Sequence, residues 1–586
     1  MAVTGKAFDF NLLKRVYAYV NPYKKTFYML VFITIGLAFV TPLVPYFIGH
    51  TVDKFIAAKD RQGLLNITLL MVFILLVRGV MQYYQTYLSN ALGQTVIKDL
   101  RKKLLHKIIN FNLKYFDHTP IGTLITRVVS DMETIADIFS EGLISMIGDI
   151  LQLSVLIILM FIMNWKFSLA TLSVIPLLFI ATRYFQIGIR EAFKEVRTQV
   201  ANLNTFVQEH VTGMSVVQIF NREKVEMEKF REINQKHATA NIRGIWYYSI
   251  FFPVVEILSA TSLGLLVWIG AREVIMGRAT IGEITTFIMF NNMLFRPIRE
   301  LADKFNTLQM GMVSSERIFK VMDTESSAEN NGKLIAKDIQ GKIEFENVVF
   351  AYNDEDWVLK NVSFKLNPGE TLAIVGATGA GKSSIISLLN RFYEINSGSI
   401  KIDGIDIRDY ELFSLRMNIA FVAQDVFLFS DTIANNISLR NDSITREEII
   451  NAAKMVGADK FIDNLPNGYD YNVGERGAML SSGQRQLLSF IRAYVYNPRI
   501  LILDEATSSI DTETEELIQY ATDKLTENRT SIVIAHRLAT IQKADNILVL
   551  DKGEIKETGN HQELLRQNGL YKRLYELQFE DKTKVA

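Results

Sequence analysis

The sequence predicts a polytopic α-helical membrane domain followed by an α/β domain of the P-loop NTPase class, and three observations support this fold class. Long apolar runs fill roughly the first 310 of the 586 residues. Short Val, Ile and Leu runs alternate with glycine and aspartate in the remainder. A glycine-rich loop there separates a strand-like segment from a helical one. Because so long a chain exceeds one hydrophobic core, we expect a membrane domain at 1–320, a linker at 321–342 and a cassette at 343–580.

Bulk composition excludes several classes of function. The 63 basic and 63 acidic residues balance, so net charge gives no reason to expect a nucleic-acid partner. The chain has no cysteine, which excludes disulfides, thiolate zinc sites and cysteine nucleophiles. A cysteine-free chain suits a cytoplasm-facing protein.

Six apolar segments approach the roughly 20 residues that a bilayer-spanning helix needs. We expect the spans at Phe27 to Ile48, Leu64 to Leu88, Ser140 to Met163, Phe167 to Tyr184, Ile245 to Ile269 and Ile281 to Pro297. Pro42 and Pro45 interrupt the first span, which a kinked membrane helix tolerates. An even number of spans predicts that both termini lie on one side.

That side is predicted to be cytoplasmic. Lys and Arg crowd the stretches Lys98 to Lys107 and Arg183 to Arg243, whereas Asn164 to Lys166 is only a tight connection. Lys54, Lys59 and Arg61 in the first predicted outer loop oppose this orientation.

Helical periodicity continues beyond the membrane. From Leu64 to Phe111 the chain has no proline, and it predicts a helix of roughly 70 Å. Helical periodicity also continues from Phe167 to Val211, so two helical hairpins should project into the cytoplasm. Polar residues within the spans either line a cavity or pair helices together, and Arg78 pairing with Asp149 or Glu256 is one such arrangement. The candidates are Arg78, Asp149, Gln152, Glu256, Asn291 and Asn292.

The glycine-rich loop Gly376 to Ser383 follows the strand-like Thr371 to Val375 and precedes a helical run. This is the setting of a phosphate-binding loop, in which backbone N–H groups and a helix N-terminus hold a polyphosphate. Lys382 should reach the terminal phosphates and Ser383 should ligate Mg²⁺. The residues expected to contact nucleotide here are Gly376, Thr378, Gly379, Ala380, Gly381, Lys382, Ser383 and Ser384.

A second predicted phosphate-site element lies further along the chain, and its Asp504 comes 122 residues after Lys382. Arg499 to Glu505 is a buried-type strand that ends in two acids. Asp504 should hold Mg²⁺ through water, and Glu505 should polarise the attacking water as the general base.

With these motifs in place, Leu480-Ser-Ser-Gly-Gln484 resembles the signature motif of ATP-binding cassette (ABC) exporter half-transporters of the multidrug and lipid-flippase group. The resemblance covers nearly the whole chain. It implies that two cassettes stack head to tail, and that Ser481, Gly483 and Gln484 of one close on the ATP held by the other.

The resemblance also assigns roles outside the phosphate loop. Tyr352 matches the aromatic that stacks on adenine, and Gln424 the residue that links Mg²⁺ to the membrane domain. Asp511 matches a loop residue facing the partner cassette, and His536 the switch histidine on the γ-phosphate. The expected Mg²⁺ ligands are Ser383, Gln424 and Asp504, and the expected catalytic pair is Glu505 and His536.

The membrane half resembles the family too. Phe116-Asp117 with Gly122, Arg127 and Asp131 resembles the first intracellular coupling segment, and Glu209 to Glu223 resembles the second. Gly474-Glu-Arg-Gly477 resembles an exporter-specific loop and argues against an importer.

The leading hypothesis is ATP-driven export of hydrophobic or amphipathic compounds across the bacterial cytoplasmic membrane by alternating access. Two alternatives are a flippase for a lipid or lipid-linked substrate and an ATP-gated channel or regulator without productive turnover. Ser482 replaces the usual first glycine of the signature, as in catalytic subunits of two-gene exporters. Because Ser481 and Gly483 remain, we favour a homodimer, with a heterodimer as the alternative.

Overall fold

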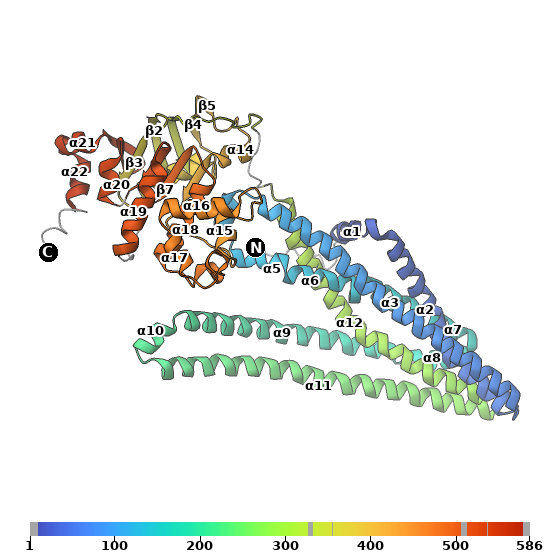
Figure 1. Cartoon of the computed structure of the whole chain (residues 1–586). Coiled ribbons are helices and arrows are strands. Elements are labelled where there is room, and N and C mark those ends of the chain that lie inside the picture. Colours follow the sequence, from blue (N-terminus) through green and yellow to red (C-terminus); the bar gives the residue numbers. More distant parts are fainter. Residues whose placement is uncertain (1–9, 326–331, 354–355, 505–511, 536, 578–586) are drawn as a thin grey trace. The chain divides into compact units, whose positions relative to one another are not determined.

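The computed structural model describes residues 10–325, 332–353, 356–504, 512–535 and 537–577 (Figure 1). The chain divides into two compact units, each described here by itself. The first comprises Met1–Ile109 and Ile121–Thr324, and the second comprises Asn110–Pro120 and Glu325–Ala586. The short segment 110–120 therefore belongs with the cassette.

The membrane unit is built of helices. They are α1 (Phe10–Ala18), α2 (Lys24–Thr51), α3 (Arg61–Ile109), α5 (Ile121–Val128), α6 (Ser130–Asp137), α7 (Leu143–Met163), α8 (Trp165–Leu172), α9 (Ile175–Thr212), α10 (Met214–Ile219), α11 (Glu223–Ile275) and α12 (Ile281–Asp323), with a π-helical turn at Val52–Ile56 after α2. The long helices continue through internal prolines, at Pro42 and Pro45 in α2, Pro253 in α11 and Pro297 in α12, because neighbouring groups in a membrane domain can satisfy the freed backbone carbonyls. α3 alone has 49 residues, which corresponds to roughly 74 Å.

Five helical segments among the described residues are long and apolar enough to cross a membrane, so the chain is a multi-pass membrane protein. They are Asn21–Ile56, Arg61–Ile109, Ile144–Met163, Trp165–Thr212 and Glu223–Ile275. α12 holds the sixth predicted span but does not reach that apolarity, because Glu283, Asn291 and Asn292 interrupt its hydrophobic run. The count of six therefore stays a prediction.

The fourth predicted span differs in detail from the structure. It is divided into α8 and α9, with Ser173 and Val174 between them. Pro176 has no N–H to donate to the carbonyl of Leu172, so the helical ladder is interrupted there. Beyond this break α9 lies beside α11, and α10 joins them, as the predicted second hairpin requires (Figure 1).

One apolar cluster of the membrane unit lies where α7, α8, α9, α11 and α12 meet. Its buried side chains are Leu156, Met160, Phe167, Leu178, Val255, Leu266, Phe287, Phe290, Leu294 and Phe295. The phenyl rings of Phe167 and Phe287 meet edge to face, with centroids 5.4 Å apart. Such aromatic pairs pack helices firmly where apolar burial alone gives little driving force.

The end of α2 is fastened to the start of α12. The carboxylate of Asp53 accepts hydrogen bonds from the Thr280 hydroxyl, at 2.5 Å, and from the Gly282 N–H, at 2.7 Å. It thus caps the first turn of α12, where a negative charge is favourable. Gly49 and Gly282 let the backbones touch, because a Cβ on Gly282 would lie 2.1 Å from the Gly49 carbonyl oxygen.

We therefore predict that Gly282→Ala destabilises the membrane unit. Inserting a methyl group into so tight a contact forces the backbones apart and should cost about 1–3 kcal/mol. Thermal unfolding of the detergent-solubilised protein measures this. Gly264→Ala on α11 is the matched control, because a Cβ there meets nothing within 4 Å. Equal melting temperatures for the two variants would contradict the prediction.

The cassette contains two sheets. The antiparallel sheet has the order β2-β1-β4-β5 and the central sheet the order β10-β9-β3-β8-β7-β6. The strands are β1 (Ile343–Ala351), β2 (Trp357–Leu366), β3 (Thr371–Gly376), β4 (Ser397–Ile402), β5 (Ile405–Asp406), β6 (Ile419–Val422), β7 (Ile500–Asp504), β8 (Thr530–Ile534), β9 (Asn546–Asp551) and β10 (Glu554–Gly559). β3, β6, β7, β8 and β9 run parallel. Their near-continuous apolar runs follow from burial on both faces.

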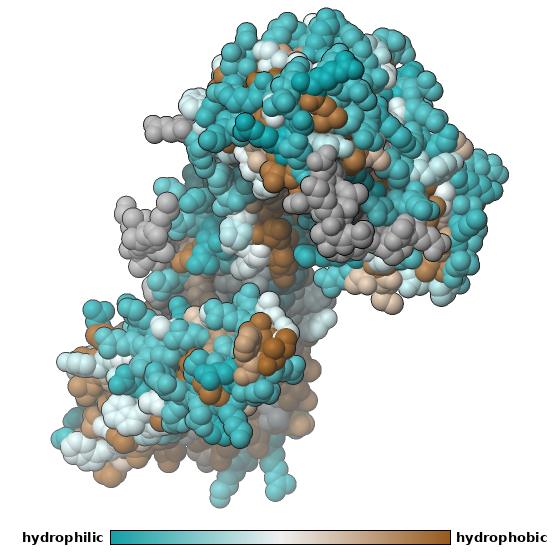
Figure 2. Space-filling view, turned by 90° about the vertical axis from the view of Figure 1, so that its left-hand side faces the viewer, coloured by the Kyte–Doolittle hydropathy of each residue, from teal (hydrophilic) through white to brown (hydrophobic). Residues whose placement is uncertain are grey.

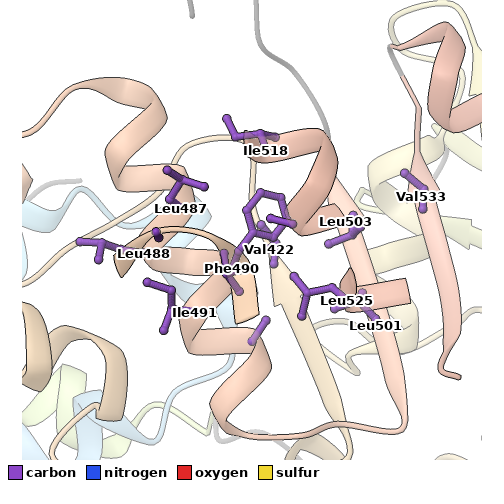
Figure 3. Close-up of a cluster of buried hydrophobic side chains, with 14 of the residues drawn as sticks. Val422, Leu487, Leu488, Phe490, Ile491, Leu501, Leu503, Ile518, Leu525 and Val533 are labelled. Atoms are coloured by element: carbon purple, nitrogen blue, oxygen red, sulfur yellow. The ribbon is translucent and has the colours of Figure 1, made fainter. Parts of the chain in front are cut away.

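Helices cover the central sheet. The cassette unit contains α4 (Leu113–His118), α13 (Lys382–Leu389), α14 (Leu412–Met417), α15 (Ile433–Ser438), α16 (Arg446–Val456), α17 (Asp459–Asp463), α18 (Ser482–Val495), α19 (Thr512–Thr526), α20 (Leu538–Lys543), α21 (His561–Gln567) and α22 (Leu570–Tyr575). Figure 3 shows Phe490 of α18 beside Val422 of β6, and Leu501 and Leu503 of β7 belong to the same buried cluster. This core fixes the start of α18 relative to the strand ends.

Candidate functional site: a nucleotide-binding edge

The phosphate loop lies between β3 and α13, as its motif predicts. β3 ends at Gly376 between β8 and β9, and α13 begins at Lys382. Gly379 and Gly381 have left-handed φ values of +82° and +104°. A Cβ on Gly376 would lie 2.3 Å from the Leu550 carbonyl oxygen. Glycine is therefore needed at these positions for conformation and for close backbone packing.

Lys382 is already held at the loop. Its ammonium group donates to the carbonyl oxygens of Gly376, at 2.6 Å, and Ala377, at 3.1 Å. Burial lowers the pKa of Lys382, and the charge of nearby Asp504 partly offsets this shift. A polyphosphate would replace two neutral acceptors by charged ones, which form stronger bonds with an ammonium group.

The other loop residues differ in exposure. Thr378, Gly379 and Ser383 are exposed, whereas Ala380 and Ser384 are buried. The buried Ser384 hydroxyl lies 3.0 Å from the Tyr352 hydroxyl. The structure thus brings Tyr352, which directly follows β1, to the first turn of α13.

Two of the predicted Mg²⁺ ligands lie at the carboxyl end of a parallel strand or just after it, which is the usual ligand edge of such sheets. Asp504 ends β7, and exposed Gln424 comes two residues after β6. Ser383 opens toward solvent in the first turn of α13. One carboxylate with a hydroxyl and an amide oxygen suits Mg²⁺, which usually keeps several waters and uses substrate phosphates. Their role as ligands stays a prediction.

Three predicted residues, Glu505, Asp511 and His536, lie outside the described residues. The strands before them are well defined: β7 ends at Asp504 and β8 at Ile534, and these strands are neighbours in the sheet.

The signature segment begins α18 with a reciprocal cap. The Ser481 hydroxyl accepts from the Gln484 N–H at 3.2 Å, and the Gln484 side chain accepts from the Ser481 N–H at 3.0 Å. Gly483 is buried beneath this turn, while Ser481 and Ser482 are exposed. The helix N-terminus thus presents a hydroxyl donor and a positive dipole end to an anion. Ser482, where the signature motif usually has glycine, occupies an exposed position in the first turn of α18 that accommodates a side chain.

Replacing Ser481 by alanine should destabilise this helix start. Loss of a serine N-cap costs about 0.5–2 kcal/mol. Urea unfolding of the full chain, followed by a fluorescent label on the cassette, measures the change. Ser482→Ala removes a neighbouring exposed hydroxyl that is not the cap, so it should leave the midpoint unchanged. An equal shift in both variants would argue against the cap.

The membrane unit contains a cavity of about 490 Å³. Four of the predicted intramembrane polar residues line it: Arg78, Asp149, Gln152 and Asn292. Asn291 instead accepts a buried hydrogen bond of 2.8 Å from Ser262. The proposed pairing of Arg78 with Asp149 is not what the structure shows, because Asp149 pairs with Lys304 of α12. Lys304 lies beyond the predicted end of the sixth span, which is why the sequence did not indicate it.

The residues of the first predicted coupling segment are divided between the two compact units. Asp131 is buried, pairs with Arg127 at 2.5 Å and accepts from the Ser314 hydroxyl at 3.0 Å, which fastens α6 to α12. In the cassette unit, Asp117 of α4 accepts a hydrogen bond from the Tyr393 hydroxyl. The sequence did not point to Tyr393.

In the second predicted coupling segment, the side chains of Val216, Ile219 and Phe220 are exposed, and Figure 2 shows a hydrophobic patch at that end of the hairpin.

Comparison with known proteins agrees with this geometry. Residues 27–298 match the ABC transporter transmembrane region, and residues 359–508 match the ABC transporter family. The uncharacterized ABC transporter ATP-binding protein YknV of Bacillus subtilis is 38% identical over 98% of this chain and 96% of its own length. The ATP-dependent lipid A-core flippase of Desulfotalea psychrophila is 37% identical over 97% of this chain and 99% of its own. The putative multidrug export ATP-binding/permease protein YgaD of Bacillus subtilis is also 37% identical, over 97% of this chain and 99% of its own.

These matches extend over both units and include the phosphate loop, the signature helix and the membrane helices. A nucleotide-binding cassette and its membrane domain are therefore fused in one polypeptide. The chain belongs to the ABC transporter family.

Proposed function

We propose that the chain is one half of an ATP-driven exporter that moves amphipathic compounds across the bacterial cytoplasmic membrane. The carrying observation is the cavity of the membrane unit, in which polar side chains share the wall with apolar ones such as Leu37, Val44 and Met293. A wall of both kinds suits a substrate with a polar head and an apolar body. The family's cassette supplies ATP hydrolysis as the energy source.

The ATP site of this exporter is shared between two chains. Lys382, Asp504, Glu505 and His536 of one chain would face Ser481 of the other, with Mg²⁺ held by Ser383, Gln424 and Asp504. ATP favours the closed cassette pair by its higher affinity for that state, and hydrolysis then releases the pair. Both termini and the cassette lie in the cytoplasm, where ATP is.

A second candidate, lipid flipping, is favoured by a specific observation. The cavity wall contains Arg78, Arg296 and Lys304, together with the carboxylate of Asp149. Cationic side chains within a membrane domain bind phosphate or carboxylate head groups strongly. A relative named as a lipid A-core flippase is consistent with such a cargo.

Reconstitution in proteoliposomes tests both candidates. ATP should drive uptake of a fluorescent amphipathic dye under the export hypothesis, or movement of a fluorescent phospholipid between leaflets under the flippase hypothesis. Arg78→Ala should weaken the phospholipid reaction more than the dye reaction. ATP hydrolysis that no dye or lipid stimulates, and that moves neither, would contradict both and favour a regulator.

The oligomeric mass of the chain expressed alone tests whether its partner is a second copy of the same chain or a different subunit. We expect a homodimer that hydrolyses ATP, because Ser481 and its cap are intact despite Ser482. A monomer that is inactive without a second gene product would show a heterodimer.

A further inference from the structure

We propose that Tyr393 is a positioning residue that links the adenine base of ATP to the membrane helices through Tyr352 on one side and Asp117 on the other. This inference rests on the proposed role of Tyr352 as the adenine platform. All three residues belong to the cassette unit, so their contacts are described within one compact body.

The first link is between two aromatic rings. Tyr352 and Tyr393 meet edge to face, with centroids 5.0 Å apart and planes at 90°. Tyr352 is held from behind by Phe350, at a centroid distance of 4.7 Å, and by its contact with Ser384 at the start of α13. A base stacked on Tyr352 would restrict this ring and with it the position of Tyr393.

The turn that carries Tyr393 is rigid. The buried Arg391 side chain donates to Glu394 at 3.0 Å and to the Ile407 carbonyl oxygen at 3.4 Å. Arg416 donates to the backbone carbonyl oxygens of Asn390, at 3.2 Å, and Arg391, at 2.9 Å. Because the backbone is fastened on both sides, the phenol of Tyr393 has a fixed direction.

The second link is the hydrogen bond from the Tyr393 hydroxyl to the Asp117 carboxylate. Asp117 lies in the last turn of α4, where the helix dipole disfavours a negative charge. A hydrogen bond from a donor outside the helix therefore stabilises its carboxylate. Burial and this bond both raise the pKa of Tyr393, which keeps the phenol a neutral donor. Asn112 caps the other end of α4 by accepting from the Tyr115 N–H at 3.1 Å.

The chain itself carries any displacement of α4 onward. α3 ends at Ile109 and α5 begins at Ile121, so the intervening segment is joined directly to two membrane-unit helices. Tyr352, Tyr393, Lys114 and Phe116 also line one cavity of about 410 Å³. This cavity is therefore lined both by the predicted adenine platform and by α4.

The test uses the full chain in lipid nanodiscs with one cysteine, Gln152→Cys, as a reporter in the membrane cavity. The native sequence contains no cysteine, so labelling by a maleimide reports this position alone. The labelling rate is measured without nucleotide and with Mg-ATP plus vanadate, and the dissociation constant of ATP is measured in parallel. The variants are Tyr393→Phe, Asp117→Ala, Asp117→Asn and the Tyr393→Phe/Asp117→Ala double variant.

In the parent protein, ATP should change the labelling rate at least about fivefold. Tyr393→Phe and Asp117→Ala should each reduce that change to less than about twofold without weakening ATP binding, and the double variant should show no further loss. Asp117→Asn keeps an acceptor and should retain most of the response. Tyr410→Phe is the control, because the Tyr410 hydroxyl donates to the Ile402 carbonyl oxygen of β4, at 3.2 Å, and not to Asp117.

An unchanged ATP response in Tyr393→Phe, or additive losses in the double variant, would overturn the link. Tyr352→Ala separates this result from the premise. If that variant binds ATP as tightly as the parent does, Tyr352 is not the adenine platform and the proposal fails at its first step. If the parent protein itself shows no ATP response, the proposed alternating access fails instead.

Discussion

Replacing Glu505 by glutamine should abolish steady-state ATP hydrolysis while leaving ATP binding intact. A general base contributes about 10²–10⁴ to the rate, and the amide cannot take a proton from the attacking water. Because the substitution is nearly isosteric, the cassette should still close on ATP. Phosphate release from the purified chain and equilibrium ATP binding measure the two effects separately.

The matched control is Glu527→Gln, which removes an exposed carboxylate that pairs with Lys524 at 2.9 Å and lies before the start of β8, not at the carboxyl ends of the strands. It should hydrolyse ATP at the parent rate. Persistent turnover in Glu505→Gln would show that another group is the base. Loss of ATP binding in that variant would show that Glu505 acts on nucleotide affinity rather than on chemistry.

The second large effect is expected for Lys382→Ala, which should weaken ATP binding by roughly a hundredfold. Hydrogen bonds to charged groups contribute about 1.5–3 kcal/mol each, and about 1.4 kcal/mol corresponds to a factor of ten. The loop should still fold, because its glycine conformations do not depend on the lysine side chain. Titration with ATP gives the dissociation constant, and thermal unfolding without nucleotide checks the fold.

Lys454→Ala provides the charge control, because Lys454 is an exposed cation in the last turn of α16. It should bind ATP normally. If both variants lost affinity equally, net charge would explain the result. If Lys382→Ala bound ATP normally, the loop would not be the phosphate site.

The phosphate loop and the signature helix could be predicted because their function depends on local sequence. Gly379, Gly381 and Lys382 fix a loop conformation over a few residues. Ser481 and Gln484 likewise form a cap that depends only on a spacing of three. Such patterns need no knowledge of distant contacts.

Contacts between distant segments could not be predicted. Tyr393 and Asp117 are 276 positions apart, and Lys304 and Asp149 are 155 apart, so no periodicity relates them. Hydropathy located membrane segments but did not orient their faces, and it could not assign Asn291 to a buried bond rather than to the cavity. The break before α9 did have a local signal in Pro176, which the apolar run obscured.

The most direct test of the account is whether ATP changes the side from which the membrane cavity is reached. Gln152→Cys in proteoliposomes can be probed with a membrane-impermeant maleimide added on the cassette side or on the opposite side. We predict cassette-side labelling without nucleotide and opposite-side labelling with Mg-ATP plus vanadate. Labelling from the same side under both conditions would contradict alternating access.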